Sequence, residues 1–271
     1  MILPKQNNIE VTEFKYMLLH SNIIGEGMPF VILHGFLGMG DNWKTLAKRF
    51  SAQDYQVHLV DQRNHGRSFH CNTFNYELMV DDLKKYCDYH NIENMVLLGH
   101  SMGGKTAMQF AAAYSKMVSK LIVADIAPKY YPLHHQQILK ALLALDFSMV
   151  KTRKVADDVL SEYIQNKGIR QFLAKNLYWK FQDELALRIN LPILIENIEE
   201  VGKALDENCN YEGDTLFLAG EKSNYIEDSD VELINKHFPK ANIITISRAG
   251  HWLHAENPVD FYNEALNFIS L

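Results

Sequence analysis

Cysteine is scarce in this chain of 271 residues, which contains only Cys71, Cys87 and Cys209. The number is odd, the three lie far apart and no C-x-x-C pair occurs, so we expect neither a disulfide framework nor a cysteine zinc site. Residues 1–10 also lack the basic stretch followed by an apolar stretch that marks a secretory signal. These absences favour a reducing compartment, and the expected location is cytoplasmic.

Long apolar runs and an excess of positive charge are lacking as well. No run approaches the roughly 18–20 apolar residues that a membrane-spanning helix needs, so no membrane partner is expected. The formal net charge of -6 argues against nucleic acid as a partner. The composition, 47% hydrophobic and 22% charged, is instead that of a globular protein with a sizeable core.

The first half of the chain alternates short apolar segments with segments of helical spacing. Strands are expected at residues 14–24 (or a hairpin), 29–33, 56–60, 95–98 and 121–124, and helices at 43–50, 76–90 and 105–114. Short strands that are apolar throughout are typical of a parallel sheet covered on both faces. We therefore predict an α/β fold with a mostly parallel central sheet flanked by helices, and with ligands outside the carboxyl ends of the strands.

The alternation stops between residues 129 and 208. We find no strand pattern there, and four helices are expected, around 139–145, 155–163, 172–179 and 194–205. About 80 residues without a strand is long for one crossover between strands, which favours a helical cap. The predicted core therefore comprises residues 1–128 and 209–271, with strands resuming at 215–219 and 243–246, and the predicted cap comprises residues 129–208.

The most informative stretch is Gly99-His100-Ser101-Met102-Gly103-Gly104, which joins the strand at 95–98 to the helix at 105–114. A strand, a tight turn and a helix form the context in which G-x-S-x-G is a nucleophile elbow. Gly99 and Gly103 would remove side chains that collide where the strand and helix approach. The helix N-terminus would direct its N–H groups at Ser101. Ser101 is therefore the predicted nucleophile.

A nucleophilic serine needs a base, and the base needs an acid to orient it. His251, in the loop after the last expected strand, is the predicted base, and the acid is expected between Ser101 and His251 in the chain. Two N–H groups must also bind the oxyanion. Met102 N–H follows the nucleophile and is the first. The turn His34-Gly35-Phe36 supplies the second from Phe36, with Leu37 as the alternative.

Four motifs in this order resemble those of the α/β-hydrolase superfamily. They are the turn at residues 34–38, the loop Asp61-Gln62-Arg63-Asn64-His65-Gly66-Arg67-Ser68, the elbow at 99–104, and Gly250-His251-Trp252. The loop at 61–68 and the segment Asp125-Ile126-Ala127-Pro128 further resemble a subgroup of small bacterial esterases, the YbfF-type enzymes, with their mitochondrial relatives. The resemblance implies a serine hydrolase that cleaves small-molecule carboxylic esters or acyl thioesters without a metal or organic cofactor. It also implies a helical cap inserted after the sixth strand.

The acid departs from the commoner pattern of the superfamily, because Ser223 stands where most relatives place aspartate. Asp125 is the alternative that the esterase subgroup implies, and its strand is expected beside the strand that ends in Ser101. We therefore predict a triad of Ser101, Asp125 and His251, while Asp228, Asp230 and Glu221 remain candidates for the acid. Ser223 is expected to hydrogen-bond to Asp125 or His251.

Several further residues are expected to support the site rather than to react. We expect His34 to hold the oxyanion turn, and His100 either to line the pocket or to pack beside the nucleophile. Asp61, Arg63 and His65 are expected to fix their loop by hydrogen bonds, and the pair His134-His135 lacks a third metal ligand. Four aromatic residues either line an acyl pocket under the cap or pack in the core: Tyr130, Tyr131, Tyr178 and Trp179.

Other activities of the same fold remain open. An acyl-CoA thioesterase, a C–C hydrolase or a perhydrolase would use the same triad, and a ligand-binding protein without catalysis would be a different class. Dehalogenases and epoxide hydrolases of this fold need an aspartate nucleophile, whereas this elbow has Ser101. Short to medium acyl chains are expected, although the apolar residues of the cap also permit a long-chain tunnel.

Overall fold

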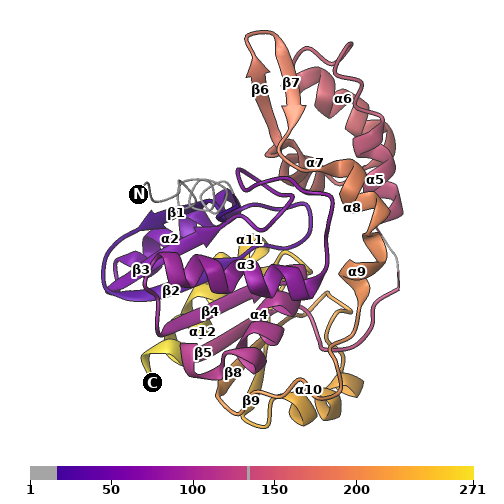
Figure 1. The fold of residues 1–271 in the computed structure, drawn as a ribbon. Coiled ribbons are helices and arrows are strands. Elements are labelled where there is room, and N and C mark those ends of the chain that lie inside the picture. Colours follow the sequence, from indigo (N-terminus) through magenta and orange to yellow (C-terminus); the bar gives the residue numbers. More distant parts are fainter. Residues whose placement is uncertain (1–16, 133–134) are drawn as a thin grey trace, which may run out of the picture.

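The structure, a computed structural model, describes residues 17–132 and 135–271 and has a seven-stranded sheet at its centre (Figure 1). The strands are β1 (Ser21–Ile24), β2 (Met28–Leu33), β3 (Tyr55–Val60), β4 (Met95–His100), β5 (Val118–Ala124), β8 (Asp214–Gly220) and β9 (Ala241–Ile246). Their order in the sheet is β1-β3-β2-β4-β5-β8-β9. β1 runs antiparallel to β3 and every other pair is parallel, which confirms the predicted mostly parallel α/β sheet.

Helices cover both faces of this sheet, as the apolar strands predict. Successive side chains of β2 point to opposite faces. Phe30 and Ile32 pack in one core with α2 (Lys44–Ser51), α11 (Leu253–Glu256) and α12 (Pro258–Ser270). Val31 and Leu33 pack in the other core with α3 (Tyr76–Tyr89), α4 (Met102–Ala113) and α10 (Val231–His237). All six residues of β4 are buried, because this strand lies in the middle of the sheet.

The register of the central strands brings the predicted site residues to one edge of the sheet. Leu33 of β2 is paired with Gly99, and Ala124 of β5 is paired with His100. Ser101 N–H extends this pairing by donating to Ala124 O at 3.0 Å. The turn after β2, the elbow after β4 and Asp125 after β5 therefore lie side by side.

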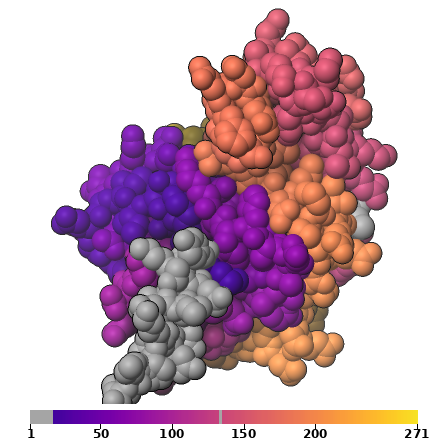
Figure 2. All heavy atoms as spheres, turned by 45° about the horizontal axis from the view of Figure 1, so that its top comes forward, coloured from indigo at the N-terminus to yellow at the C-terminus, as the bar shows by residue number. Residues whose placement is uncertain are grey.

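Residues 129–208, called the insertion below, follow β5 and form a lobe that projects beyond the sheet (Figures 1 and 2). The lobe contains α5 (Gln136–Leu143), α6 (Arg153–Tyr163), α7 (Lys167–Ala174), β6 (Leu177–Phe181), β7 (Glu184–Leu187), α8 (Leu191–Glu196) and α9 (Ile198–Gly202). Its own apolar core includes Leu142, Leu160 and Leu185. This core continues onto Phe36 and Met102, so the insertion packs over the end of the sheet that carries the predicted site.

Three sequence expectations for the insertion are wrong. β6 and β7 form an antiparallel hairpin where no strand was expected, and the helix expected at 172–179 ends at Ala174. Tyr178, Trp179 and Phe181 are aromatic residues, and aromatic side chains favour strands. The helix expected at 194–205 is also divided, because Asn197 ends α8 and begins α9.

The insertion follows β5, which is the fifth strand within the described residues, where a single strand, β1, precedes β2. Residues 14–16 of the strand expected at 14–24 lie outside the described residues, as does His134. Across the described ranges, no helix combines the length and the apolar character needed to cross a membrane.

Candidate active site

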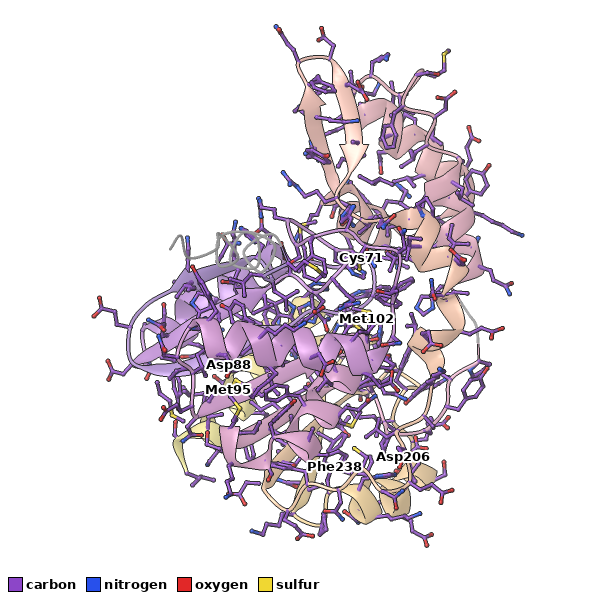
Figure 3. All side chains as sticks on the ribbon, in the orientation of Figure 1. Cys71, Asp88, Met95, Met102, Asp206 and Phe238 are labelled. Carbon is purple, nitrogen blue, oxygen red and sulfur yellow. The ribbon has the colours of Figure 1, made fainter. Side chains whose placement is uncertain are left out.

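Ser101 lies in the sharp turn between β4 and α4, with a φ of 52° and a ψ of -119°. This backbone conformation is strained for a residue that is not glycine. A Cβ on Gly99 would lie 2.1 Å from Gly103 O, and a Cβ on Gly103 would lie 2.5 Å from Leu33 O. The turn therefore has the predicted geometry, in which glycine is required where strand and helix meet. Met102 starts α4 and lies between the sheet and the insertion (Figure 3).

Asp125 follows β5 beside the elbow and is fully buried. Its Oδ1 accepts a hydrogen bond from Gly220 N–H at 2.8 Å. Its Oδ2 accepts from Ser223 Oγ at 2.5 Å and from His251 Nδ1 at 2.8 Å. The segments that follow β8 and β9 thus meet on the carboxylate of Asp125, and Ser223 makes one of the two contacts predicted for it as alternatives.

The charge of the Asp125 carboxylate decides which ring nitrogen of His251 carries the hydrogen. Burial raises the pKa of Asp125 to about 6, and the hydrogen bonds from Gly220 and Ser223 oppose that rise. The ionised carboxylate can only accept hydrogen bonds, so Nδ1 of His251 carries the hydrogen. Nε2 is then the basic nitrogen of the neutral ring. The imidazole can take up a proton at Nε2 while Asp125 stabilises the resulting charge.

The other candidates for the acid have different partners. Glu221 Oε2 accepts from Arg248 N–H at 2.5 Å, and Asp230 Oδ2 lies 2.7 Å from Lys129 Nζ. Asp228 begins a short 3-10 helix that continues into α10. Among the four candidates, Asp125 is the one placed by a hydrogen bond against His251.

The turn after β2 is held by two buried histidines. His34 Nδ1 donates to Gly35 O at 2.9 Å, and its Nε2 accepts from Gln62 N–H at 3.0 Å. His65 Nε2 accepts from Leu37 N–H at 3.2 Å. Burial lowers the pKa of His34, and it lowers the pKa of His65 to about 3, so both rings are neutral at neutral pH. His34 therefore links Gly35 of this turn to Gln62 of the loop after β3.

This network discriminates between the two predicted oxyanion donors. Leu37 N–H is committed to His65, which favours Phe36 N–H as the partner of Met102 N–H. Gly35 lies against the elbow, since a Cβ on Gly35 would lie 3.3 Å from Ser101 Cβ. The peptide that carries the Phe36 N–H therefore begins next to the candidate nucleophile.

Asp61 and Arg63 fix the loop that follows β3, as expected. Asp61 accepts hydrogen bonds from Gly40 N–H at 2.7 Å and from Arg67 N–H at 2.8 Å. Arg63 Nε forms a buried ion pair with Asp82 at 2.6 Å. In residues 17–132 and 135–271, no three His, Cys, Asp or Glu side chains are grouped so that they could hold a metal ion.

Two further histidines, His100 and His254, pack next to the loop that carries His251. His100 Nε2 donates to His251 O at 2.8 Å, and the His100 ring lies 4.8 Å from the rings of both His251 and His254. His254 in turn stacks on Trp43 at 4.0 Å. Burial lowers the pKa of His100 to about 3 and lowers that of His254 too, so both are neutral. The His100 ring therefore packs against the rings of His251 and His254.

A narrow cavity lies beside Ser101. Its wall includes Ser101 and Met102 of the elbow, Tyr131 and Tyr225 of neighbouring loops, and Ile198 and Val201 of α9. The empty space amounts to about 320 Å³, but the centre of a water molecule fits in only about 10 Å³ of it. The space next to the candidate nucleophile is therefore tight and largely apolar.

The four aromatic residues of the insertion that were expected near a pocket divide into different environments. Tyr131 lines the cavity. Tyr130 and Trp179 are 59% and 50% exposed, and the ring of Tyr178 packs under the guanidinium group of Arg188. One of the four thus contributes to the candidate site.

Sequence reasoning missed Lys105 of α4, which is fully buried. Its Nζ donates to Lys129 O at 2.6 Å and to Lys203 O at 2.5 Å, at the points where the chain enters and leaves the insertion. Burial lowers the pKa of this lysine to about 7. Tyr225, whose ring stacks on His251 at 3.9 Å, was missed too. Neither position has a periodic or motif signal, because both contacts join segments far apart in the chain.

The chain is similar to known proteins over most of its length. The model of a family described as alpha/beta hydrolase fold matches residues 28–155. The sn-1-specific diacylglycerol lipase ABHD11 of Danio rerio is 34% identical over 252 residues, which cover 90% of this chain and 79% of that protein. Esterase YbfF of Escherichia coli K12 is 32% identical, with coverages of 85% and 88%. The solved structure of a marine microorganism esterase has a TM-score of 0.89 at 43% identity, and the match covers 93% of this chain and 99% of that one.

Proposed function

Because this chain belongs to the α/β-hydrolase family and is a carboxylesterase-type hydrolase, we propose that Ser101, His251 and Asp125 form its catalytic triad. The triad would hydrolyse carboxylic esters through an acyl-Ser101 intermediate. The observation that carries this proposal is the 2.8 Å hydrogen bond from His251 Nδ1 to the buried Asp125, whose strand pairs with the strand that leads to Ser101. The cavity between the elbow and Tyr225, which stacks on His251, supports it.

In the acylation step, Ser101 Oγ attacks the ester carbonyl carbon while His251 Nε2 takes the hydroxyl proton. The carbonyl electron pair moves onto oxygen, where Phe36 and Met102 N–H groups bind the negative charge. Each such donor contributes about 3–4 kcal/mol to the transition state in comparable enzymes. When the tetrahedral intermediate collapses, the bond to the alcohol oxygen breaks and His251 returns the proton to the leaving alcohol.

In the deacylation step, a water molecule replaces the alcohol. His251 Nε2 takes a proton from this water as its oxygen attacks the acyl carbon of acyl-Ser101. The second tetrahedral intermediate releases the carboxylic acid, and Ser101 Oγ regains the proton from His251. His251 is a cation in both steps, so the carboxylate of Asp125 stabilises both transition states.

We further propose that residues 129–208 act as a cap on a core of residues 1–128 and 209–271. The packing of the insertion on Phe36 and Met102 supports this division, because both residues belong to the proposed oxyanion site. Ile198 and Val201 of α9 supply one wall of the cavity beside Ser101. The cap would thus define the shape of the small-molecule esters that reach the nucleophile.

A fluorophosphonate probe tests the proposed acyl-enzyme chemistry directly. The activated Ser101 should form one covalent phosphonyl adduct, which intact-protein mass spectrometry detects and peptide mapping assigns to residue 101. Ser101→Ala should take no label, and Ser270→Ala, which changes an exposed serine at the end of α12, should be labelled like the wild type. A protein that takes no label and hydrolyses no p-nitrophenyl ester would contradict the proposed function.

The tight cavity predicts a preference for short to medium acyl chains. Forcing methylene groups into a packed site costs about 1–3 kcal/mol, so kcat/KM should fall about tenfold or more from p-nitrophenyl butyrate to the palmitate. Ile198→Ala widens the cavity wall and should move the optimum toward longer chains. The control Val155→Ala changes an exposed valine of α6 and should leave the profile unaltered. A flat profile from acetate to palmitate would show that this cavity does not hold the acyl chain.

A further inference from the structure

The loop after β8 contributes an aromatic ring to the proposed general base. The rings of Tyr225 and His251 lie with their centroids 3.9 Å apart and their planes at 19°, which is a stacked arrangement. Tyr225 is two residues beyond Ser223, whose hydroxyl donates a hydrogen bond to Asp125. The same short segment therefore contacts both proposed partners of Ser101, with Ser223 against Asp125 and Tyr225 against His251.

Tyr225 is itself held in place from two directions. Its N–H donates to Ser223 Oγ at 3.3 Å, and its carbonyl accepts a hydrogen bond from the Tyr131 hydroxyl. The Tyr131 hydroxyl also accepts from Ala127 N–H at 2.8 Å. The two tyrosine rings stack with centroids 5.2 Å apart and planes at 25°. Tyr131, Tyr225 and His251 therefore form one continuous stack of three rings.

Tyr131, at the end of this stack away from His251, lies in the stem of the insertion, which is the pair of segments around residues 129–131 and 202–203. Lys105 Nζ lies 5.3 Å from the centroid of the Tyr131 ring and binds the carbonyls of Lys129 and Lys203. Tyr131 N–H donates to Gly202 O at 2.8 Å, which pairs the entering and leaving segments. Backbone contacts of the insertion thus fix the first ring of the stack.

A neutral aromatic ring over an imidazole favours the charged form of the imidazole. The face of the ring is electron-rich and attracts a cation, which Tyr225 meets only after His251 has taken a proton. Burial raises the pKa of Tyr225 and of Tyr131 above the ordinary value, so both phenols stay neutral. The neutral ring of Tyr225 therefore stabilises the protonated form of His251 and does not itself change protonation state.

The other groups around His251 in the described chain do not duplicate this contact. Asp125 binds the edge of the ring at Nδ1, and His100 binds the backbone carbonyl. His100 and His254 are kept neutral by burial, so neither adds a competing charge near neutral pH. Trp252 meets the ring at 68°, edge to face, with centroids 5.6 Å apart.

We propose that Tyr225 is a positioning residue, whose ring stacks on His251 and stabilises its imidazolium form. In this proposal, Tyr131 fixes the position of Tyr225 relative to the stem of the insertion. This inference rests on the proposed role of His251 as the general base. It gives the segment after β8 a function other than supplying the acid. Ser223 of this segment hydrogen-bonds to the proposed acid, and Tyr225 stacks on the proposed base.

Tyr225→Leu tests the stack, and Tyr225→Phe is its matched control. Loss of the ring should lower kcat on p-nitrophenyl butyrate about threefold to thirtyfold. It should also move the acid limb of the pH profile of kcat/KM to lower pH by about 0.5–1, because the imidazolium loses stabilisation. Tyr225→Phe keeps the ring and should restore most of the lost rate and the position of the limb. An unmoved acid limb in Tyr225→Leu, or an equal loss in Tyr225→Phe, would overturn the proposal.

A titration of the His251 ring by NMR separates this inference from the proposed function. Measured in a Ser101→Ala background, it needs no turnover, and the pKa of His251 should fall by about 0.5–1 when Tyr225→Leu is added. Tyr131→Phe, which loses only the hydroxyl bonds to Tyr225 and Ala127, should produce a smaller fall in the same direction. An unchanged pKa in a folded double variant would overturn the role of Tyr225, even where ester hydrolysis by the wild type is established.

Discussion

Replacing Ser101 with alanine should reduce the hydrolysis of p-nitrophenyl butyrate by about a millionfold. The change removes the oxygen of the proposed acyl-Ser101 intermediate, and the remaining groups cannot form that bond. His251 and Asp125 keep their 2.8 Å hydrogen bond, and Phe36 and Met102 keep their N–H groups, so only weak stabilisation of direct water attack remains. Initial rates at high enzyme concentration measure the effect.

The control for this variant is a serine that no part of the mechanism uses. Ser270→Ala, at the exposed end of α12, should hydrolyse the ester at the wild-type rate. Circular dichroism should show that Ser101→Ala is folded, because alanine can occupy the strained turn at about the same cost as serine. If the folded Ser101→Ala variant retained one per cent or more of the activity, the proposed acyl-Ser101 intermediate would be untenable.

Asp125→Asn should lower kcat by about ten-thousandfold while leaving the fold intact. The asparagine amide would face His251 Nδ1 with N–H groups instead of a carboxylate oxygen. The imidazole would then accept at Nδ1 and carry its hydrogen on Nε2, the nitrogen that must remove the proton of Ser101. The steady-state rate on p-nitrophenyl butyrate measures this loss.

Although Asp125→Asn should lower kcat, it should not lower the stability of the folded protein. Burial raises the pKa of Asp125 to about 6 from an ordinary value of 3.8, so between these pH values the folded chain holds a proton that the unfolded chain has released. Stability therefore falls as the pH rises through this window, and above it the buried charge costs up to about 3 kcal/mol. Asparagine removes this cost. At pH 7, Asp125→Asn should unfold at an equal or higher urea concentration than the wild type.

Ser223→Ala is the matched comparison for Asp125→Asn. It removes one hydrogen bond to Asp125 but keeps the carboxylate, which Gly220 N–H and His251 still bind. Since one hydrogen bond to a charged group contributes about 1.5–3 kcal/mol, kcat should fall by about a hundredfold at most. If Asp125→Asn lost no more activity than Ser223→Ala, a different acid would have to orient His251.

The local sequence was most informative where the chemistry depends on neighbouring residues. The turn around Ser101 is such a case, since the glycines needed for the close approach of strand and helix lie within two residues of the proposed nucleophile. The strands were predictable for a related reason. Strands buried on both faces must be apolar at every position, and this leaves a clear pattern in β2, β4 and β5.

The insertion was less predictable because its elements are short and partly exposed. Leu177–Phe181 contains apolar residues that satisfy both a helical and a strand pattern, and the hairpin partner, β7, decides between them. The division between α8 and α9 depends on Asn197, whose side chain donates to Ile193 O at 2.9 Å. A pattern of apolar spacing carries no information on either contact.

The sequence alone determined the α/β sheet, the elbow around Ser101, the histidine loop at residue 251 and the place of Asp125 on the neighbouring strand. These features follow from residue types at short separations and from the order of motifs along the chain. Tertiary structure decided which N–H group of the turn after β2 is hydrogen-bonded to His65, which carboxylate meets His251, and that Tyr225 stacks on His251. Each of these contacts joins two segments that lie about 30 to 130 residues apart in the printed sequence. Contacts at such separations depend on how the sheet brings its loops together, and no local pattern records them.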